Sequence, residues 1–321
     1  MSFSMQVKEE VLKQISTARH CRIAELAAII SYQGQVAIYG CGNDKRYRLC
    51  IHTENVMIAS KAFALIKKTF KASVHTMVRS NPLNNSRLYV LDVNGFEDSK
   101  SILMAVKLIK EDGFVNDNLL VDDLILQSPC CKRSFIRGAF LVGGSISAPQ
   151  KAYHFEINAQ TENKANQLIN LFKAFDVNAK KVLRKGNHIV YVKEGSQISD
   201  VLNICGAHVA MMELENVRIV KDMRNSINRQ VNCEAANIGK TVSAATKQIE
   251  DIMLIKNTIG IEGLNDNLRE VALIRLENED MPLKDLGLLL DPPLGKSGVN
   301  HRLRKISEIA DNIRDDSKED F

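Results

Sequence analysis

The feature that most constrains the fold is a pair of matching segments in which small residues recur at helical spacing. Ser134 and Gly138 stand four positions apart, so in a helix both lie on one face, and Ala24 and Ala28 repeat that spacing. The offset between the two segments is constant, because 134−24, 138−28 and 144−34 all give 110, the last pair being Gly34 and Gly144. Because small side chains let two helix axes approach closely, we expect two copies of one helix that pack against each other.

Further matches extend this duplication. Thr53-Glu54-Asn55 recurs as Thr161-Glu162-Asn163, and a helical apolar pattern follows each copy. Each Thr is predicted to be an N-cap. The tripeptide alone could recur by chance. Strand-like runs at 86–92, 152–157 and 188–193 and closing helices at 102–110 and 198–205 complete two units, each of which reads helix, strands, helix, strands, helix.

Composition places the chain among ordinary globular proteins. It has 321 residues, which allows two domains, with 45% hydrophobic and 25% charged residues. No apolar run approaches the roughly 18 residues that a membrane span needs, and the polar N-terminus does not have the pattern of a signal peptide. We therefore expect a cytoplasmic protein without a membrane partner.

The cysteines predict neither a disulfide framework nor a metal site. The seven lie at positions 21, 41, 50, 130, 131, 205 and 233, an odd number without any C-x-x-C pair. We expect reduced, mostly buried thiols, no metal and no cofactor. For the adjacent Cys130 and Cys131, packing is the expected role and redox sensing the alternative.

The distribution of charge is more informative than the net value of +5. The segment 217–249 contains six basic and two acidic side chains, and the segment 296–305 contains four basic and no acidic side chains. The segment 308–321 reverses the balance, with six acidic and two basic side chains, and is expected to end in an irregular tail.

The basic segment 218–232 joins the duplicated part to the rest of the chain. It is either a linker that contacts DNA phosphates or a solvated connector, and the residues do not decide between these. Its candidate phosphate contacts are Arg218, Lys221, Arg224 and Arg229. A long helix is expected to follow and to end at Gly260 and Gly263.

The C-terminal part predicts three short helices. Asn267 is the expected cap of the first, with Glu270 completing a capping box, and Pro282 is expected to open the second. The segment 291–295 forms a turn, and the third helix starts near Ser297 with its apolar positions facing inward: Val299, Leu303 and Ile306.

This order of helices is typical of a helix-turn-helix, in which the last helix enters the major groove of DNA. Asn can pair with adenine and Arg with guanine, so the polar face of the third helix suits base reading. The candidate DNA-binding residues are Lys296, Ser297, Asn300, His301, Arg302, Arg304 and Lys305. A three-helix bundle with a solvated basic face is the alternative.

Several motifs in order along nearly the whole chain resemble those of the WhiA family of bacterial sporulation and cell-division regulators. They are CRIAELAAI, RGAFLVGGSISAP followed by YHFEI, VRIVKDMRNSINRQVNCEAANIGKT, and KSGVNHRLRKI. The resemblance implies an α+β protein with a degenerate LAGLIDADG homing-endonuclease fold and a C-terminal helix-turn-helix. The first domain would be a duplicated one, with two αββαββα-type repeats, and the second would be all α.

The resemblance also implies a function. The protein would bind double-stranded DNA at the nucleoid and regulate transcription, cell division and chromosome segregation, and in some bacteria sporulation. Other transcription or division proteins are further expected partners.

The domain boundaries that we expect follow from these patterns. The LAGLIDADG-like domain would span 1–220, with repeats at about 1–112 and 113–220. A basic linker would follow at 221–232, the helix-turn-helix domain at 233–312, and an acidic tail at 313–321.

The resemblance raises the question of nuclease activity. LAGLIDADG enzymes place one carboxylate at the end of each paired helix, where the two acids hold the divalent metal ions. Those positions correspond to Gln33 and Gly143 in this chain, and neither Glu25 nor Glu156 is an obvious substitute. We therefore expect that the protein is not an enzyme. The alternatives are a metal-dependent LAGLIDADG endonuclease, and a protein-interaction scaffold with a purely structural helix-turn-helix.

Overall fold

The computed structural model describes residues 2–40, 45–81, 86–110, 113 and 115–319. The chain forms two compact units, Met1–Lys221 and Asp222–Phe321. Within the described residues, no helix combines the length and apolar character needed to cross a bilayer.

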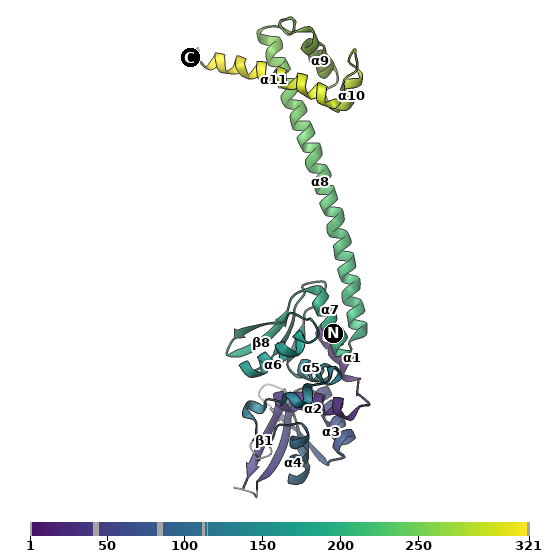
Figure 1. Ribbon diagram of the computed structural model, residues 1–321, viewed down its shortest axis with the longest axis vertical. Coiled ribbons are helices and arrows are strands. Elements are labelled where there is room, and N and C mark those ends of the chain that lie inside the picture. Colours follow the sequence, from purple (N-terminus) through teal and green to yellow (C-terminus); the bar gives the residue numbers. More distant parts are fainter. Residues whose placement is uncertain (1, 41–44, 82–85, 111–112, 114, 320–321) are drawn as a thin grey trace. The chain divides into compact units, whose positions relative to one another are not determined.

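The first unit contains the predicted duplication (Figure 1). After α1 (Phe3–Leu12), the first copy consists of α2 (Arg19–Gln33), β1 (Gly34–Tyr39), β2 (Arg46–Thr53), α3 (Val56–Phe70), β3 (Val74–Asn81), β4 (Ser86–Val93) and α4 (Phe96–Ala105). Two short 3-10 turns, Asp117–Leu119 and Asp123–Leu126, precede the second copy. That copy consists of α5 (Pro129–Gly143), β5 (Gly144–Ile146), β6 (Phe155–Asn158), α6 (Glu162–Lys173), β7 (Lys180–Arg184), β8 (Asn187–Val192) and α7 (Gly195–Cys205).

The two antiparallel sheets have the same topology. Their strand orders are β1-β2-β4-β3 and β5-β6-β8-β7. In both, the glycine that follows the first helix begins the first strand and lies opposite an isoleucine: Gly34 opposite Ile51, and Gly144 opposite Ile157. Figure 1 shows α2 and α5 side by side between the two sheets. The α+β class and the internal duplication are therefore confirmed.

The close packing of α2 against α5 is also confirmed. Ala24 and Ala28 are fully buried, and Ser134 is nearly so. A Cβ atom at Gly138 would lie 2.7 Å from the carbonyl oxygen of Glu25 and 2.8 Å from Cβ of Ala28. Such distances are shorter than carbon atoms tolerate, so α2 occupies the space that any side chain at position 138 would need.

Only one of the two predicted threonine caps is correct. The Thr161 hydroxyl accepts a hydrogen bond from the Lys164 N–H at the start of α6. In the first copy the cap is Asn55, whose side chain accepts from the N–H groups of Met57 and Ile58. Thr53 is still part of β2, where it pairs with Tyr89, and this strand pairing delays the start of the helix.

The second unit is all helical. Helix α8 (His208–Thr258) begins in the first unit and ends in the second, and a 3-10 turn at Ile261–Gly263 follows. Helices α9 (Asp266–Glu277), α10 (Leu283–Leu288) and α11 (Lys296–Glu319) complete the unit. Their buried apolar side chains form one core with the end of α8, among them Ile252, Ile255, Leu268, Val271, Leu286, Val299, Leu303 and Ile306.

Three expectations for this unit differ from the structure. The cap of α9 is Asn265, which accepts from the Leu268 N–H, and Glu270 instead accepts from the Asp291 N–H at 2.9 Å. The segment 221–232 is not a separate linker before a helix but part of α8 itself. The segment 313–319 of the expected acidic tail continues α11, while the last two residues lie outside the described part of the chain.

Substitution of Gly138 tests the helix pair. Gly138→Leu should destabilise the protein by about 1–3 kcal/mol or more, because the side chain would enter a closed backbone contact. Gly138→Ala should already lower the midpoint of chemical denaturation. As a matched control, a Cβ atom at Gly239 on α8 would meet open space, so Gly239→Ala should be neutral or stabilising. Equal midpoints for wild type and Gly138→Leu would show that α2 and α5 do not pack as described.

Candidate nucleic-acid interface

A tight corner joins α10 to α11. The N–H of Leu294 donates to the Gly287 carbonyl at 2.8 Å, closing the loop between the two helices. A Cβ atom at Gly287 would overlap the Leu294 carbonyl and lie 3.1 Å from Cγ2 of Val299. Only a glycine at position 287 fits this corner, and the corner fixes the direction in which α11 leaves α10.

One face of α11 is anchored in the core of the unit. Val299, Leu303, Ile306 and Ala310 are buried at helical spacing, as the sequence predicted for the first three. They pack in one cluster with apolar residues of α9 and α10. The buried face therefore determines which side chains of α11 point to solvent.

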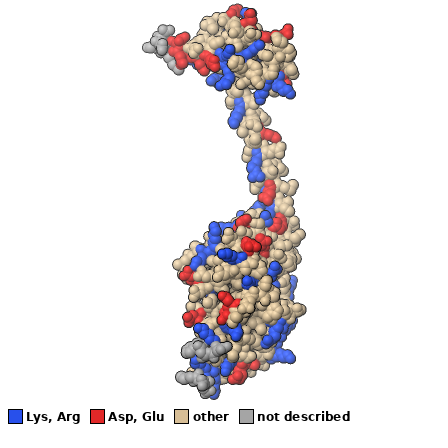
Figure 2. Space-filling model, viewed as in Figure 1, with Lys and Arg blue, Asp and Glu red and all other residues tan. Residues whose placement is uncertain are grey.

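The opposite face of α11 presents polar side chains along its first turns. Ser297, Asn300, His301 and Arg304 are exposed at i, i+3, i+4 and i+7, so they form one stripe. Exposed Lys296 and Lys305 flank it. No acidic residue occurs between Asp291 and Glu308 in the sequence. Figure 2 shows acidic side chains near the far end of α11 instead, so the start of this helix is the positively charged part.

Arg302 differs from the other candidates. Its Nη1 donates to the Asn267 carbonyl at 3.3 Å and lies 3.7 Å from a carboxylate oxygen of Glu270. Only 19% of its side chain is exposed. These contacts hold α11 against α9, so Arg302 supports the position of the stripe and does not belong to it.

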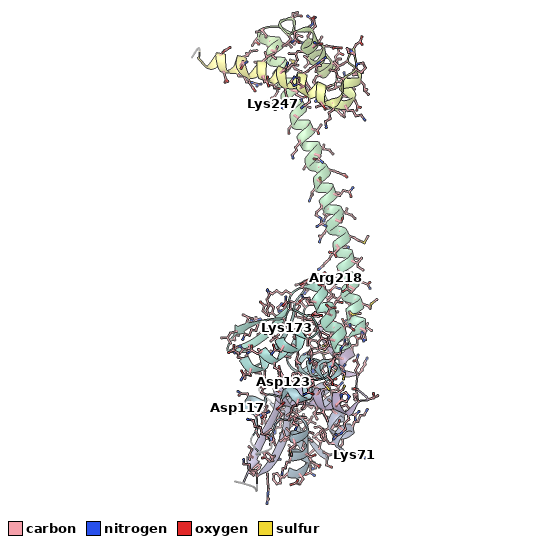
Figure 3. The ribbon with its side chains drawn as sticks, viewed as in Figure 1. Lys71, Asp117, Asp123, Lys173, Arg218 and Lys247 are labelled. Atoms are coloured by element: carbon pink, nitrogen blue, oxygen red, sulfur yellow. The ribbon has the colours of Figure 1, made fainter. Side chains whose placement is uncertain are left out.

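The four basic candidates on α8 divide into two pairs. Arg218, labelled on α8 in Figure 3, forms an ion pair with Glu215 at 2.6 Å. Lys221 donates to the Pro149 carbonyl at 2.7 Å and lies over the Tyr153 ring. Both side chains thus bind groups of the first unit. Arg224 and Arg229 are exposed on α8 and are the better candidates for phosphate contacts.

The two positions that correspond to the nuclease acids lie at the last residues of α2 and α5. Gln33 ends α2 and Gly143 ends α5, so no carboxylate stands at either position. A Cβ atom at Gly143 would lie 2.8 Å from the Asn158 carbonyl oxygen of β6. Position 143 therefore lacks both the acid and the room for one.

Glu25 does not replace these acids, because its charge is used inside the protein. The side chain is fully buried between Lys61 of α3, 3.1 Å away, and Arg137 of α5, 3.8 Å away. Burial raises the pKa of Glu25 and lowers that of Lys61, and each charge offsets the cost of burying the other. Glu156 accepts hydrogen bonds from His154 at 3.0 Å and Ser145 at 3.2 Å.

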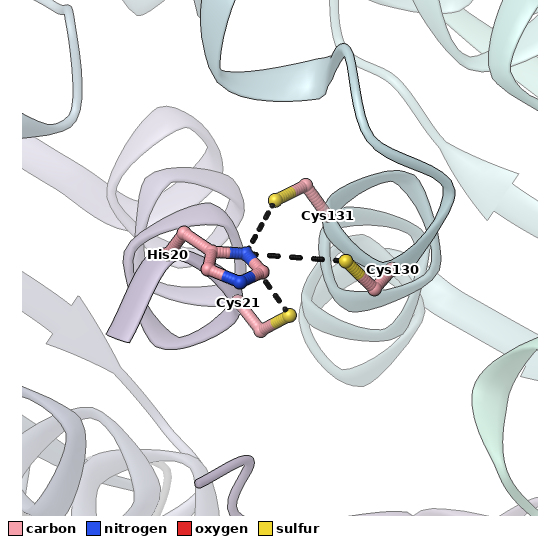
Figure 4. Close-up of side chains that lie close together, drawn as sticks. All are labelled: His20, Cys21, Cys130 and Cys131. Atoms are coloured by element: carbon pink, nitrogen blue, oxygen red, sulfur yellow. Dashed lines mark hydrogen bonds between the residues drawn. The ribbon is translucent and has the colours of Figure 1, made fainter. Parts of the chain in front are cut away.

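A cluster of one histidine and three cysteines lies at the opposite ends of α2 and α5 (Figure 4). His20 and Cys21 occupy the first turn of α2, and Cys130 and Cys131 occupy the first turn of α5. The Nδ1 atom of His20 lies 3.2 Å from the Cys131 sulfur, 3.4 Å from that of Cys21 and 3.9 Å from that of Cys130. Among the residues that the structure describes, this is the only group of three or more His, Cys, Asp or Glu side chains able to hold a metal ion.

Three family profiles match consecutive parts of the chain. They are described as the WhiA N-terminal LAGLIDADG-like domain at residues 19–109, the WhiA LAGLIDADG-like domain at 132–224, and the WhiA C-terminal HTH domain at 227–310. Together they cover most of both units.

Relatives and a solved structure match over nearly the full length. A protein of Lachnoclostridium phytofermentans named "Probable cell division protein WhiA" is 50% identical over 315 residues, which are 98% of this chain and 100% of that protein. One of the same name from Clostridium botulinum is 44% identical, over 98% of this chain and 99% of its own. The crystal structure of full-length WhiA from Thermatoga maritima, 25% identical, aligns with a TM-score of 0.58 over 97% of this chain and 99% of that one.

Two glycines of the helix-turn-helix provide a matched test of the corner. Gly287→Ala should destabilise the second unit and weaken DNA binding, because a methyl group would collide with the Leu294 carbonyl. Gly298→Ala should be neutral or stabilising by up to about 1 kcal/mol, since its methyl would meet only ordinary contacts with Leu294. Thermal denaturation and DNA titration of both variants check this. If the two alanine variants behave alike, Gly287 does not determine the corner.

Proposed function

The chain belongs to the WhiA family. We propose that it is a sequence-specific DNA-binding regulator whose endonuclease scaffold no longer cuts DNA. The observation that carries the proposal is the exposed stripe on α11, which contains no acidic residue. The loop closed by the Leu294–Gly287 hydrogen bond holds the start of this helix in place. In the cell, the protein would control transcription, cell division and chromosome segregation, and in some bacteria also sporulation. Action on chromosomal DNA would place the protein at the nucleoid.

The stripe divides into base-reading and phosphate-binding groups by residue chemistry. Asn300 can pair through two hydrogen bonds with adenine, and Arg304 with guanine. Ser297 and His301 lie beside them on the same face and can each donate or accept one hydrogen bond. Lys296 and Lys305 carry point charges at the flanks, which suits phosphates, and phosphate contacts fix the register of a helix without reading sequence.

Two further groups extend this assignment. Arg302, bound to Asn267 and Glu270, would keep α11 at a fixed angle to α9 and contribute only indirectly. Arg224 and Arg229 on α8 would add phosphate contacts that depend on salt but not on sequence.

Loss of nuclease activity follows from the two helix ends. Metal-assisted cleavage needs carboxylates to hold the ions that activate water and neutralise the charge that develops on the phosphate. Gln33 and Gly143 provide none, and the nearby Glu25 is already neutralised by Lys61 and Arg137. The first unit would then act as a scaffold for DNA or for other transcription or division proteins.

DNA binding by α11 is tested by substitutions within and beside the stripe. Asn300→Ala and Arg304→Ala should each cost about 1–3 kcal/mol on the operator and relax the preference at one base pair. Lys305→Ala should weaken all sequences alike and reduce the slope of log K against log salt by about 0.9. Lys256→Ala, an exposed lysine of α8, is the control and should preserve the ratio of operator to scrambled binding.

The operator is obtained first, by sequencing the DNA that the protein binds in cells, and titrations at several salt concentrations follow. If Asn300→Ala and Arg304→Ala both leave the operator-to-scrambled ratio unchanged, α11 does not read DNA, and the helix-turn-helix is a structural part of a protein-interaction scaffold.

Absence of cleavage is tested on the same DNA. Incubation of the purified protein with operator DNA and Mg²⁺ or Mn²⁺ should leave the duplex intact, because no acid stands at positions 33 and 143. Gel analysis of both strands detects nicks as well as double-strand breaks. Metal-dependent cutting that a point change near Gln33 or Gly143 abolishes would reverse the assignment and make the protein an endonuclease.

A further inference from the structure

The duplication places two pairs of metal-ligating side chains in register. His20 corresponds to Cys130 and Cys21 to Cys131, at the same offset that relates Ala28 to Gly138 in the packed helices. Each repeat therefore contributes two adjacent side chains from the first turn of its central helix. The close packing of α2 on α5 brings the two pairs together, with all four ligand atoms within 4.8 Å of one another (Figure 4).

We propose that His20, Cys21, Cys130 and Cys131 bind one zinc ion that joins the two repeats. Three thiolates and one imidazole are a common ligand set of structural zinc, and soft sulfur ligands favour zinc over magnesium or calcium. In a tetrahedral site with bonds of about 2.3 Å to sulfur and about 2.0 Å to nitrogen, neighbouring ligand atoms stand roughly 3.5–3.8 Å apart. The distances of 3.2, 3.4 and 3.9 Å from His20 Nδ1 to the three sulfurs are close to this.

The electrostatic surroundings suit the charge of such a site. Zinc with three thiolates and a neutral imidazole carries a net charge of −1, and the N-terminal ends of two helices stabilise negative charge. Neither helix has an acidic residue in its first turn, and in the described part of the chain neither N-cap residue, Ala18 nor Ser128, makes a side-chain cap. The first turns contain basic residues instead: Arg19, Arg22 and Lys132.

The exposure of the four ligands provides an entry path and a closed final site. Cys21 and Cys131 are 5% exposed and form the inner side of the cluster, while His20 and Cys130 face solvent. An ion can therefore arrive from one side and become enclosed by four protein ligands. Because no coordination position stays open for water or substrate, the site would be structural and not catalytic.

The location agrees with a structural role. Positions 33 and 143 lie at the opposite ends of the same two helices, roughly 20 Å away at about 1.5 Å per residue. A zinc ion at the first turns would hold α2 and α5 together at one end, while Gly138 brings the helix backbones into contact farther along. It takes no part in the DNA binding proposed for α11, so the two proposals can fail independently.

Metal content and cobalt substitution test the site on the full chain. Protein purified under reducing conditions without chelator should contain about one zinc per chain. Co²⁺ added to metal-free protein should give the intense visible bands of a tetrahedral ion and the ultraviolet charge-transfer bands of thiolate ligands. Cys21→Ser and Cys130→Ser should lose both signals, and Cys233→Ser, at an exposed cysteine of α8, should keep them. His20→Cys should also keep a tetrahedral site, because it only exchanges imidazole for thiolate.

Two results would overturn the proposal. The first is a failure of the reduced wild-type protein to bind one equivalent of Zn²⁺ or Co²⁺, or the detection by mass spectrometry of a disulfide within the cluster in cells. The second is a cobalt spectrum that Cys130→Ser leaves unchanged. If the serine variants fail to fold, the cobalt spectrum of the wild-type protein still tests whether the site binds metal. A second measurement on the wild type is thermal denaturation: zinc added to metal-free protein should raise the melting temperature by several degrees, since an ion that binds only the folded state stabilises it.

Discussion

The contact between Gly138 and the backbone of α2 is the constraint on which the rest of the first unit depends. The two helices approach so closely because α5 carries no side chain at the point of contact: a Cβ at Gly138 would lie 2.7 Å from the Glu25 carbonyl oxygen. The two repeats pack together through this contact, which therefore sets how close α2 and α5 lie at both of their ends. At one end stand Gln33 and Gly143, and at the other the cluster of His20, Cys21, Cys130 and Cys131.

Much of this architecture is visible in the sequence because its signals are periodic. Small residues at a spacing of four, repeated at a constant offset in the second half of the first unit, reveal both the helix pair and the duplication. The sequence does not determine the cap positions, since several capping residues stand close together before each helix. Asn55 is the cap and Thr53 is not, because β2 pairs with β4 through Thr53. In α9 the cap is Asn265, and Glu270 binds the Asp291 N–H and does not complete a capping box with Asn267. Both decisions depend on contacts distant in sequence, which local patterns do not contain.

In the candidate sites, too, local sequence patterns reveal some features, while others depend on contacts between distant residues. The periodicity of apolar residues identifies the exposed face of α11. It does not predict that Arg302 binds Asn267 and Glu270 while Arg304 stays exposed. The continuous helix through 221–232 leaves no local signal, because exposed polar residues suit a helix as well as a linker. The cysteine cluster escapes a search for C-x-x-C spacing, since its ligands are adjacent residues in two distant segments. The signal that could have revealed it is the repeat offset itself, which relates His20 to Cys130 and Cys21 to Cys131.

The ends of α2 and α5 at Gln33 and Gly143 show how this LAGLIDADG-like fold forms without a carboxylate at either position. At position 33 the glutamine has nearly the shape of a glutamate but is neutral, so the end of α2 carries no carboxylate. At position 143 the change is steric as well, because the Asn158 carbonyl of β6 lies where a side chain would begin. An acid at position 143 would have to displace β6, which pairs with β5 and β8, and the sheet would oppose this movement. The backbone of the second repeat therefore leaves no room for a carboxylate at position 143, while the buried Glu25, Lys61 and Arg137 keep α2, α3 and α5 together.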